Sequence, residues 1–270
     1  MPEFCQGPPD PSPNPRPSID LWLLSTDHVG AAALATLEDC LSPPEQAQLA
    51  KIRFPQAQRQ FLLSRGCLRH LLSRYTGQAP ADLAFVYGSR GKPALNPRGD
   101  GAGLAPRFNL SHSGQRLLMA ISGAERVRAI GVDLEILRPV SLLPGLCRRC
   151  LTPAEAETVL ALPTPEADHR FLRYWTGKEA CLKALGVGIT DSLQSLELSL
   201  GPEALTAVPV AVAVVAPTLP EYPGQLYQWQ PDEQYLAAVA VQSTSLEASD
   251  FCRYQATPQD LLAGAAMSAL

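Results

Sequence analysis

The chain repeats itself, and this repeat constrains the fold more than any other feature of the sequence. Four segments of the first half recur in the same order in the second half, at offsets of between 110 and 119 residues. The pairs are 20–22 with 133–135, 41–45 with 151–155, 64–71 with 178–185, and 108–118 with 227–237. The repeat predicts an α+β protein of two pseudo-symmetric halves, each an antiparallel sheet packed with a long helix.

Each pair of segments has a local structural signature. The first pair lies in apolar runs that are typical of strands, and the fourth resembles a hairpin around a polar turn. The second pair has a hydroxyl residue, then proline, then glutamate three residues after the hydroxyl, which predicts a capped helix start at Ser42 and at Thr152. The third pair lies in helical patterns over about 58–75 and 165–185.

These elements divide the chain into regions. Residues 1–18 are rich in proline and are expected to form a disordered tail. Residues 19–124 and 125–245 are the two α+β halves, and 246–270 is a C-terminal extension with a short helix capped at Thr257. The cleft between two such halves is the expected position of the active site.

Acidic residues appear where the two halves differ. Glu135 occupies the position of Trp22 and Glu179 that of Arg65, while Asp133 matches Asp20 of the first half. Asp133 and Glu135 are two residues apart, so on a strand they face the same way. They could be solvated or capping acids on an edge strand, but the apolar residues before them indicate partial burial. Three converging carboxylates favour a hard cation, Mg²⁺ or Mn²⁺, and chemistry on phosphates.

Several basic and polar residues are candidates for binding an anionic ligand. Trp175, Glu179 and Lys183 are spaced by four, so they line one stripe of the second long helix, with Lys178 about 100° away. A surface ion pair between Glu179 and Lys183 is the alternative, but an aromatic residue on the same stripe favours contact with protein. The other candidates, each of which could instead be solvated, are Arg53, Arg90, Lys92, and Ser111 with His112 in a polar hairpin turn at 109–113.

Composition excludes other classes of protein. The net charge is −4 and no basic block stands out, so nucleic acid is not an expected partner. The longest apolar stretch, 208–216, is too short to cross a membrane and is expected to form a strand, and no secretion signal is present, which favours the cytoplasm. Seven cysteines argue against a disulfide framework, and the isolated CxxC at Cys147 and Cys150 is weak support for zinc or redox chemistry.

Three motifs carry a resemblance to a known family. They are Gly91-Lys92-Pro93 with Phe108-Asn109-Leu110-Ser111-His112-Ser113, then Gly131-Val132-Asp133-Leu134-Glu135, then the run from Trp175 to Gly186. In this order and spacing the sequence resembles the surfactin-synthetase-type (Sfp-like) 4′-phosphopantetheinyl transferases over roughly residues 20–241. The resemblance implies transfer of the phosphopantetheine arm of coenzyme A to a serine of an acyl or peptidyl carrier protein, with release of 3′,5′-ADP.

The resemblance also implies residue roles. Mg²⁺ would be held by Asp133, Glu135 and Glu179, and the catalytic residues would be Asp133, Glu179 and Lys183. Glu179 would take the serine proton directly or through water, while Lys183 would bind the α-phosphate. The remaining coenzyme A contacts would come from Ser111, His112, Arg90, Lys92, Lys178 and a basic residue before the first long helix, Arg53 or Lys51. Glu155 falls where the family also has an acid.

Partners and alternatives complete the expectations. The carrier is expected to be an acidic helical domain that docks near Cys147 to Arg149, and the enzyme is expected to be a monomer with a pseudo-dimeric fold. A binding module for coenzyme A or a carrier, without transfer, is one alternative. A magnesium-dependent nucleotide pyrophosphatase, in which water replaces the serine, is the other.

Overall fold

A computed structural model describes residues 19–96, 105–187, 193–201, 205–215, 224–243 and 246–263. The expected tail at 1–18 lies outside these residues. The helices are α1 (Ala31–Asp39), α2 (Pro43–Lys51), α3 (Pro55–Thr76), α4 (Leu143–Cys150), α5 (Pro153–Leu160), α6 (Glu166–Leu185) and α7 (Pro258–Ala263). The strands are β1 (Ile19–Ser25), β2 (Phe85–Tyr87), β3 (Pro93–Leu95), β4 (Arg107–Ser113), β5 (Arg116–Ser122), β6 (Ala129–Ile136), β7 (Glu197–Ser199), β8 (Val210–Val215), β9 (Gly224–Asp232), β10 (Tyr235–Gln242) and β11 (Phe251–Ala256).

Two sheets confirm the repeat. The first has the strand order β11-β1-β5-β4, and the second has the order β6-β10-β9-β8-β7. The matched strands β1-β5-β4 and β6-β10-β9 therefore have the same order, and neighbours within each set are antiparallel. The long helix of each half, α3 or α6, also lies at the matched place in the sequence. The chain is therefore an α+β protein of two similar halves.

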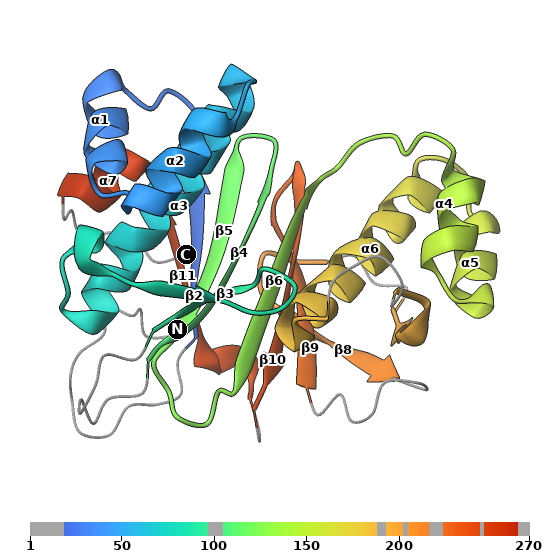
Figure 1. Ribbon diagram of the computed structural model, residues 1–270. Helices are drawn as coiled ribbons and strands as arrows, with labels where there is room; N and C mark the ends of the chain where they lie inside the picture. Colours follow the sequence, from blue (N-terminus) through green and yellow to red (C-terminus); the bar gives the residue numbers. More distant parts are fainter. Residues whose placement is uncertain are drawn as a thin grey trace.

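Buried apolar residues separate the molecule into layers. One core joins the first sheet to α3, and a second core joins the other sheet to α6. A third core lies between the sheets, because the alternate side chains of β1 and β6 that face away from the helices pack there. Figure 1 shows the result, with helices on the two outer flanks and the strands between them.

The two capped helix starts form as expected. Glu45 and Glu155 each accept the backbone N–H of the hydroxyl residue that begins α2 or α5. Both glutamates are buried, and each forms an ion pair with a basic residue of the long helix of its own half. Glu45 pairs with Arg69 at 2.6 Å, and Glu155 pairs with Lys178. A buried acid requires such a partner.

The halves meet along β4 and β6. The backbone N–H of Val132 donates to the side-chain oxygen of Asn109 at 2.8 Å, and that of Ile136 donates to the hydroxyl of Ser113 at 3.0 Å. Side chains of β4 therefore satisfy backbone groups of β6, which in a continuous sheet would pair with backbone. This seam places alternate residues of β4 beside the acidic residues of β6.

The structure corrects the expected turn and places the CxxC pair. Residues 109–113 belong to β4, and the turn begins at Gly114, because the strand continues for three polar residues beyond Leu110. Cys147 and Cys150 lie on a helix of their own, α4, and both are buried free thiols.

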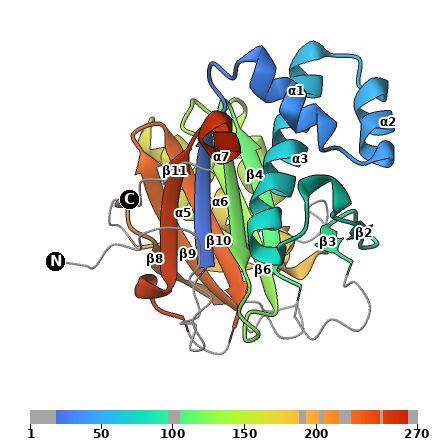
Figure 2. The same ribbon diagram turned by 90° about the vertical axis from the view of Figure 1, so that its left-hand side faces the viewer.

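The C-terminal segment completes the first half. β11 pairs with β1 in parallel, next to it at the sheet edge (Figure 2). The short helix α7 follows, and Thr257 and Asp260 cap it reciprocally as the sequence predicts. Among the described residues, no helix combines the length and apolar character needed to cross a membrane.

Candidate active site

Three carboxylates and one ammonium group gather at the seam between the halves. Asp133 and Glu135 lie on β6 and face α6, which carries Glu179 and Lys183 one helical turn apart. Asp133 and Glu179 are buried, and the side chain of Lys183 is 25% exposed. Glu135 and Glu179 come from positions where the two halves of the sequence differ, whereas Asp133 matches Asp20.

Asp133 is the centre of this cluster. Its Oδ1 accepts hydrogen bonds from Lys183 Nζ at 2.7 Å and from Ser111 Oγ at 2.9 Å. Its Oδ2 is buried and has no hydrogen-bond partner among the described residues. Burial raises the pKa of Asp133, while the charge of Lys183 opposes that rise.

Glu135 is held from two sides. Trp175 Nε1 donates to Oε1 at 3.0 Å, and Ser113 Oγ donates to Oε2 at 3.3 Å. Burial and the nearby charge of Asp133 raise its pKa. The expected stripe of Trp175, Glu179 and Lys183 therefore does face the acids of β6.

The pKa of Glu179 is raised toward neutrality. Burial, followed by the charge of Asp133, raises its pKa from 4.5 to about 7. The positive charge of Lys183 offsets only part of this rise in pKa, because Lys183 Nζ lies 4.0 Å from Glu179 but 2.7 Å from Asp133. A carboxyl group that titrates near neutrality can accept a proton at physiological pH.

The raised pKa predicts how stability depends on pH. Because folded Glu179 binds its proton more tightly than the unfolded chain does, the metal-free protein should lose stability as pH rises from about 4.5 to about 7. Asp20, whose pKa burial raises to about 6, contributes in the same direction. Thermal unfolding with EDTA, from pH 5 to 8, should show a smaller decline in Tm for Glu179→Gln than for the wild type. Equal declines would contradict the shift at Glu179.

Lys178 does not reach the acid cluster. Its side chain is fully buried and forms an ion pair with Glu155, and Nζ also donates to the carbonyl oxygens of Leu193 and Cys150. Glu155 accepts in addition from the backbone N–H of Leu198 at 2.8 Å. Lys178 lies about 100° from Glu179 on the helix, which turns it toward α4 and α5. Its ammonium therefore holds elements of the second half together.

Lys92 links the two halves instead of projecting freely. Its Nζ donates to the carbonyl oxygens of Lys183, Ala184 and Ile130 at 2.6, 3.1 and 2.9 Å. The last carbonyls of a helix lack partners within the helix, so this ammonium caps the end of α6. Burial lowers its pKa to about 8.

A cavity of about 460 Å³ lies beside Lys92 at the seam. Its first-half walls come from β2, β3 and the start of β4, and its second-half walls from the start of β6 and the end of α6. The exposed Arg90, together with Arg107 and Arg128, gives this cavity a positive rim. The cavity can therefore receive an anionic ligand that extends toward Lys183.

Two further predicted residues are exposed. His112 follows Ser111 on β4, and partial burial of its ring, together with the charge of Lys183, lowers its pKa. Arg53 lies between α2 and α3, and no contact described for the acid cluster involves it. The structure thus brings Ser111 to the cluster and His112 beside it.

The sequence does not assign a role to two polar residues of the seam. Asn109 and Ser113 are recognisable only as members of a turn and of a family motif, yet both contact β6. Their spacing with Ser111, at every second position, is the alternation of a strand and was the available signal.

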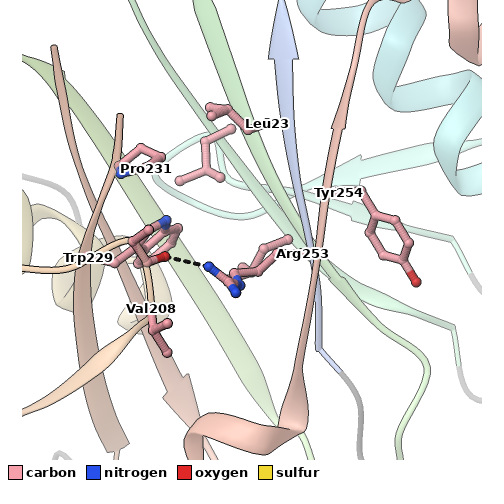
Figure 3. A pocket seen from close by; sticks show the side chains of 9 residues that line it. Leu23, Val208, Trp229, Pro231, Arg253 and Tyr254 are labelled. Atoms are coloured by element: carbon pink, nitrogen blue, oxygen red, sulfur yellow. Dashed lines mark hydrogen bonds between the residues drawn. The ribbon is translucent and has the colours of Figure 1, made fainter. Parts of the chain in front are cut away.

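A separate cavity of about 200 Å³ lies between the two sheets. Leu23 and Arg253 from the first sheet face Trp229 and Val208 across it (Figure 3), and Arg253 donates to the carbonyl of Ala207. None of the predicted site residues lines this cavity, so it is distinct from the acid cluster.

Comparison with known proteins identifies the family of the chain. Residues 129–239 match the 4′-phosphopantetheinyl transferase superfamily, and residues 30–124 match the 4′-phosphopantetheinyl transferase N-terminal family. The chain is 39% identical to the 4′-phosphopantetheinyl transferase HetI of Nostoc sp. over 83% of this chain and 87% of that protein. The chain belongs to the 4′-phosphopantetheinyl transferase family. More distant relatives include Sfp of Bacillus subtilis, 26% identical over 59% of this chain and 66% of that protein, and AcpT of Escherichia coli, 28% identical over 68% and 88%.

This family assignment implies an enzyme that uses coenzyme A, and the cluster can be tested for fit to a divalent cation. Among the described residues, no three His, Cys, Asp or Glu side chains are already gathered as ligands of one metal ion. Instead, the Lys183 ammonium lies against Asp133. The buried, partnerless Oδ2 of Asp133 and the raised pKa values of the three acids fit a cation-binding role for the transferase.

Proposed function

We propose that this transferase moves the 4′-phosphopantetheine group of coenzyme A to a carrier-protein serine, with Asp133, Glu135 and Glu179 holding Mg²⁺ at the seam. The observation that supports this most is the juxtaposition of these three acids with Lys183. Mn²⁺ has similar ligand preferences and is an acceptable substitute. When bound, the cation would neutralise charge on the diphosphate of coenzyme A.

Lys183 and Glu179 have separate roles in the transfer step. Lys183 binds the α-phosphate, which leaves as part of 3′,5′-ADP, and stabilises the charge that develops on it. The serine oxygen attacks the β-phosphorus, and the bond from that phosphorus to the oxygen bridging to the α-phosphate breaks. Glu179 accepts the serine proton directly or through water, since a hydroxyl is a weak nucleophile without a base.

The cavity beside Lys92 is proposed to receive the adenylate end of coenzyme A. Arg90 lines the cavity and is exposed, so it can contact phosphate. Ser111 and His112 would meet the 3′-phosphate. Lys92 would act mainly by fixing the end of α6 beside the ligand, because its ammonium already donates hydrogen bonds to three carbonyl oxygens.

Intact-mass spectrometry tests the proposed function. The protein is incubated with coenzyme A, Mg²⁺ and several apo carrier proteins, with one sample in EDTA and one containing a carrier whose acceptor serine is alanine. A gain of one phosphopantetheine that both controls abolish is expected. No gain with any carrier, despite coenzyme A binding, would favour a binding module. Hydrolysis of coenzyme A without a carrier would favour a pyrophosphatase.

The carrier is proposed to dock on the surface formed by α4 and the segment before it. This segment follows β6 directly, only a few residues after Glu135. Leu142 is 84% exposed and adopts a positive φ of 57°, and a cavity of about 490 Å³ lies beside it. Arg148 and Arg149 are exposed on α4, while Cys147 is fully buried and contributes only to the core. Apolar and basic groups together suit an acidic helical partner.

Reversing the charge of both arginines tests this surface. The Arg148→Glu/Arg149→Glu variant should raise the KM for an acidic carrier about tenfold, because like charges would then face each other. Its KM for coenzyme A should stay unchanged. Steady-state kinetics at two salt concentrations measure this, with Arg126→Glu, at the exposed β5–β6 turn, as the control. An unchanged carrier KM would place the docking surface elsewhere.

A further inference from the structure

Glu135 differs from its neighbour Asp133 in how its oxygens are held. Asp133 keeps one oxygen without a hydrogen-bond partner among the described residues, whereas both oxygens of Glu135 accept a hydrogen bond. The donors come from opposite sides of the seam, Ser113 from β4 of the first half and Trp175 from α6 of the second. The Glu135 side chain is therefore fixed by both halves.

Ser113 has a defined donor direction. Its oxygen accepts the backbone N–H of Ile136 at 3.0 Å. A hydroxyl has a single proton, so that proton is directed to Glu135 Oε2, 3.3 Å away. The same hydroxyl therefore contacts both the Glu135 carboxylate and the backbone of β6, where β4 and β6 meet.

Trp175 is equally constrained. Its ring stacks on Phe171, one helical turn earlier, with centroids 6.3 Å apart and an angle of 28° between the rings. The indole N–H donates but cannot accept or bind a cation, so it orients Glu135 without competing for the metal ion. A carboxylate oxygen that accepts one hydrogen bond retains a lone pair for a cation.

We infer that Trp175 and Ser113 are positioning residues that hold Glu135 in the orientation that binds the divalent cation. This inference rests on the proposed magnesium site. Hydrogen-bond donors to a metal-ligating carboxylate fix its orientation, and their loss weakens metal affinity by about 10- to 100-fold. The two halves thus contribute jointly to the orientation of one ligand.

The test measures Mn²⁺ affinity directly, by electron paramagnetic resonance or calorimetry in the presence of coenzyme A. Trp175→Phe keeps the ring and removes the N–H, and Ser113→Ala removes the hydroxyl. Each should weaken Mn²⁺ binding about tenfold, with coenzyme A affinity in EDTA unchanged. Ser113→Thr, which keeps a hydroxyl, should bind Mn²⁺ nearly as the wild type does.

Controls separate this effect from lost stability and from failure of the proposed function. Trp229→Phe alters a buried tryptophan of the core between the sheets, so it should lower Tm without changing Mn²⁺ affinity. Unchanged Mn²⁺ affinity in both single variants, with tight binding by the wild type, would overturn the positioning role alone. A wild-type protein that binds no Mn²⁺ with coenzyme A would overturn the metal site itself.

Discussion

The Glu179→Gln variant should lower kcat by at least about 10³-fold, because it removes both a base and a proposed metal ligand. Glutamine has nearly the same size and can still accept a hydrogen bond, but it cannot take up the serine proton. Without a bound cation, burial and the charge of Asp133 raise the pKa of Glu179 to about 7. Coenzyme A affinity in EDTA should change little, because Lys183 and the cavity beside Lys92 remain.

The fold of this variant should be intact. Glu179 is 3% exposed and close to two other acids, so replacing it with a neutral group should leave Tm equal or higher in EDTA. Single-turnover transfer to a carrier, at saturating Mg²⁺, measures the rate. The matched control is Glu38→Gln, at an exposed position on α1. A loss smaller than tenfold would mean that another group accepts the proton.

The repeat was enough to predict most of the fold. The recurring segments gave the strands β1 and β6, the capped starts of α2 and α5, the long helices and the two hairpins. They succeeded because each signal is local, as with a cap or an alternating strand. Two acids of the site, Glu135 and Glu179, followed from comparing the copies, because each replaces a residue of the first half that is not acidic.

Contacts between elements distant in sequence could not be predicted in this way. Lys178 looked like a ligand for phosphate, but the direction of a side chain around a helix does not reveal which neighbour it meets. Glu155, its partner, is 23 residues earlier in the sequence. In the same way, nothing in β4 or β6 alone indicated that the strands would lie together, because side chains and not a backbone ladder join them.

The close approach of α6 to β6 is another feature that only the structure reveals. In the sequence, Gly131 is recognisable only as part of a motif. A Cβ atom built on Gly131 would lie 2.1 Å from the carbonyl oxygen of Ala180 and 2.3 Å from the backbone nitrogen of Ala184. Both atoms belong to the helix backbone, so neither can move aside as a flexible side chain could. Glycine at this position allows Lys183, on the same helix, to reach Asp133 two residues further along the strand.

Gly131→Ala should therefore destabilise the protein by roughly 3 kcal/mol or more, since the added methyl must push α6 away from the sheet. The folded fraction should also lose activity, because the distance from Lys183 to Asp133 would increase. Urea unfolding measures the free energy of unfolding, and transfer per folded molecule measures the rate. The matched control for stability is Gly145→Ala on α4, where an added Cβ would meet nothing within 4 Å and helix propensity favours alanine. Equal stability of the two variants would show that α6 and β6 do not approach so closely, and the geometry of the acid cluster would have to be revised with them.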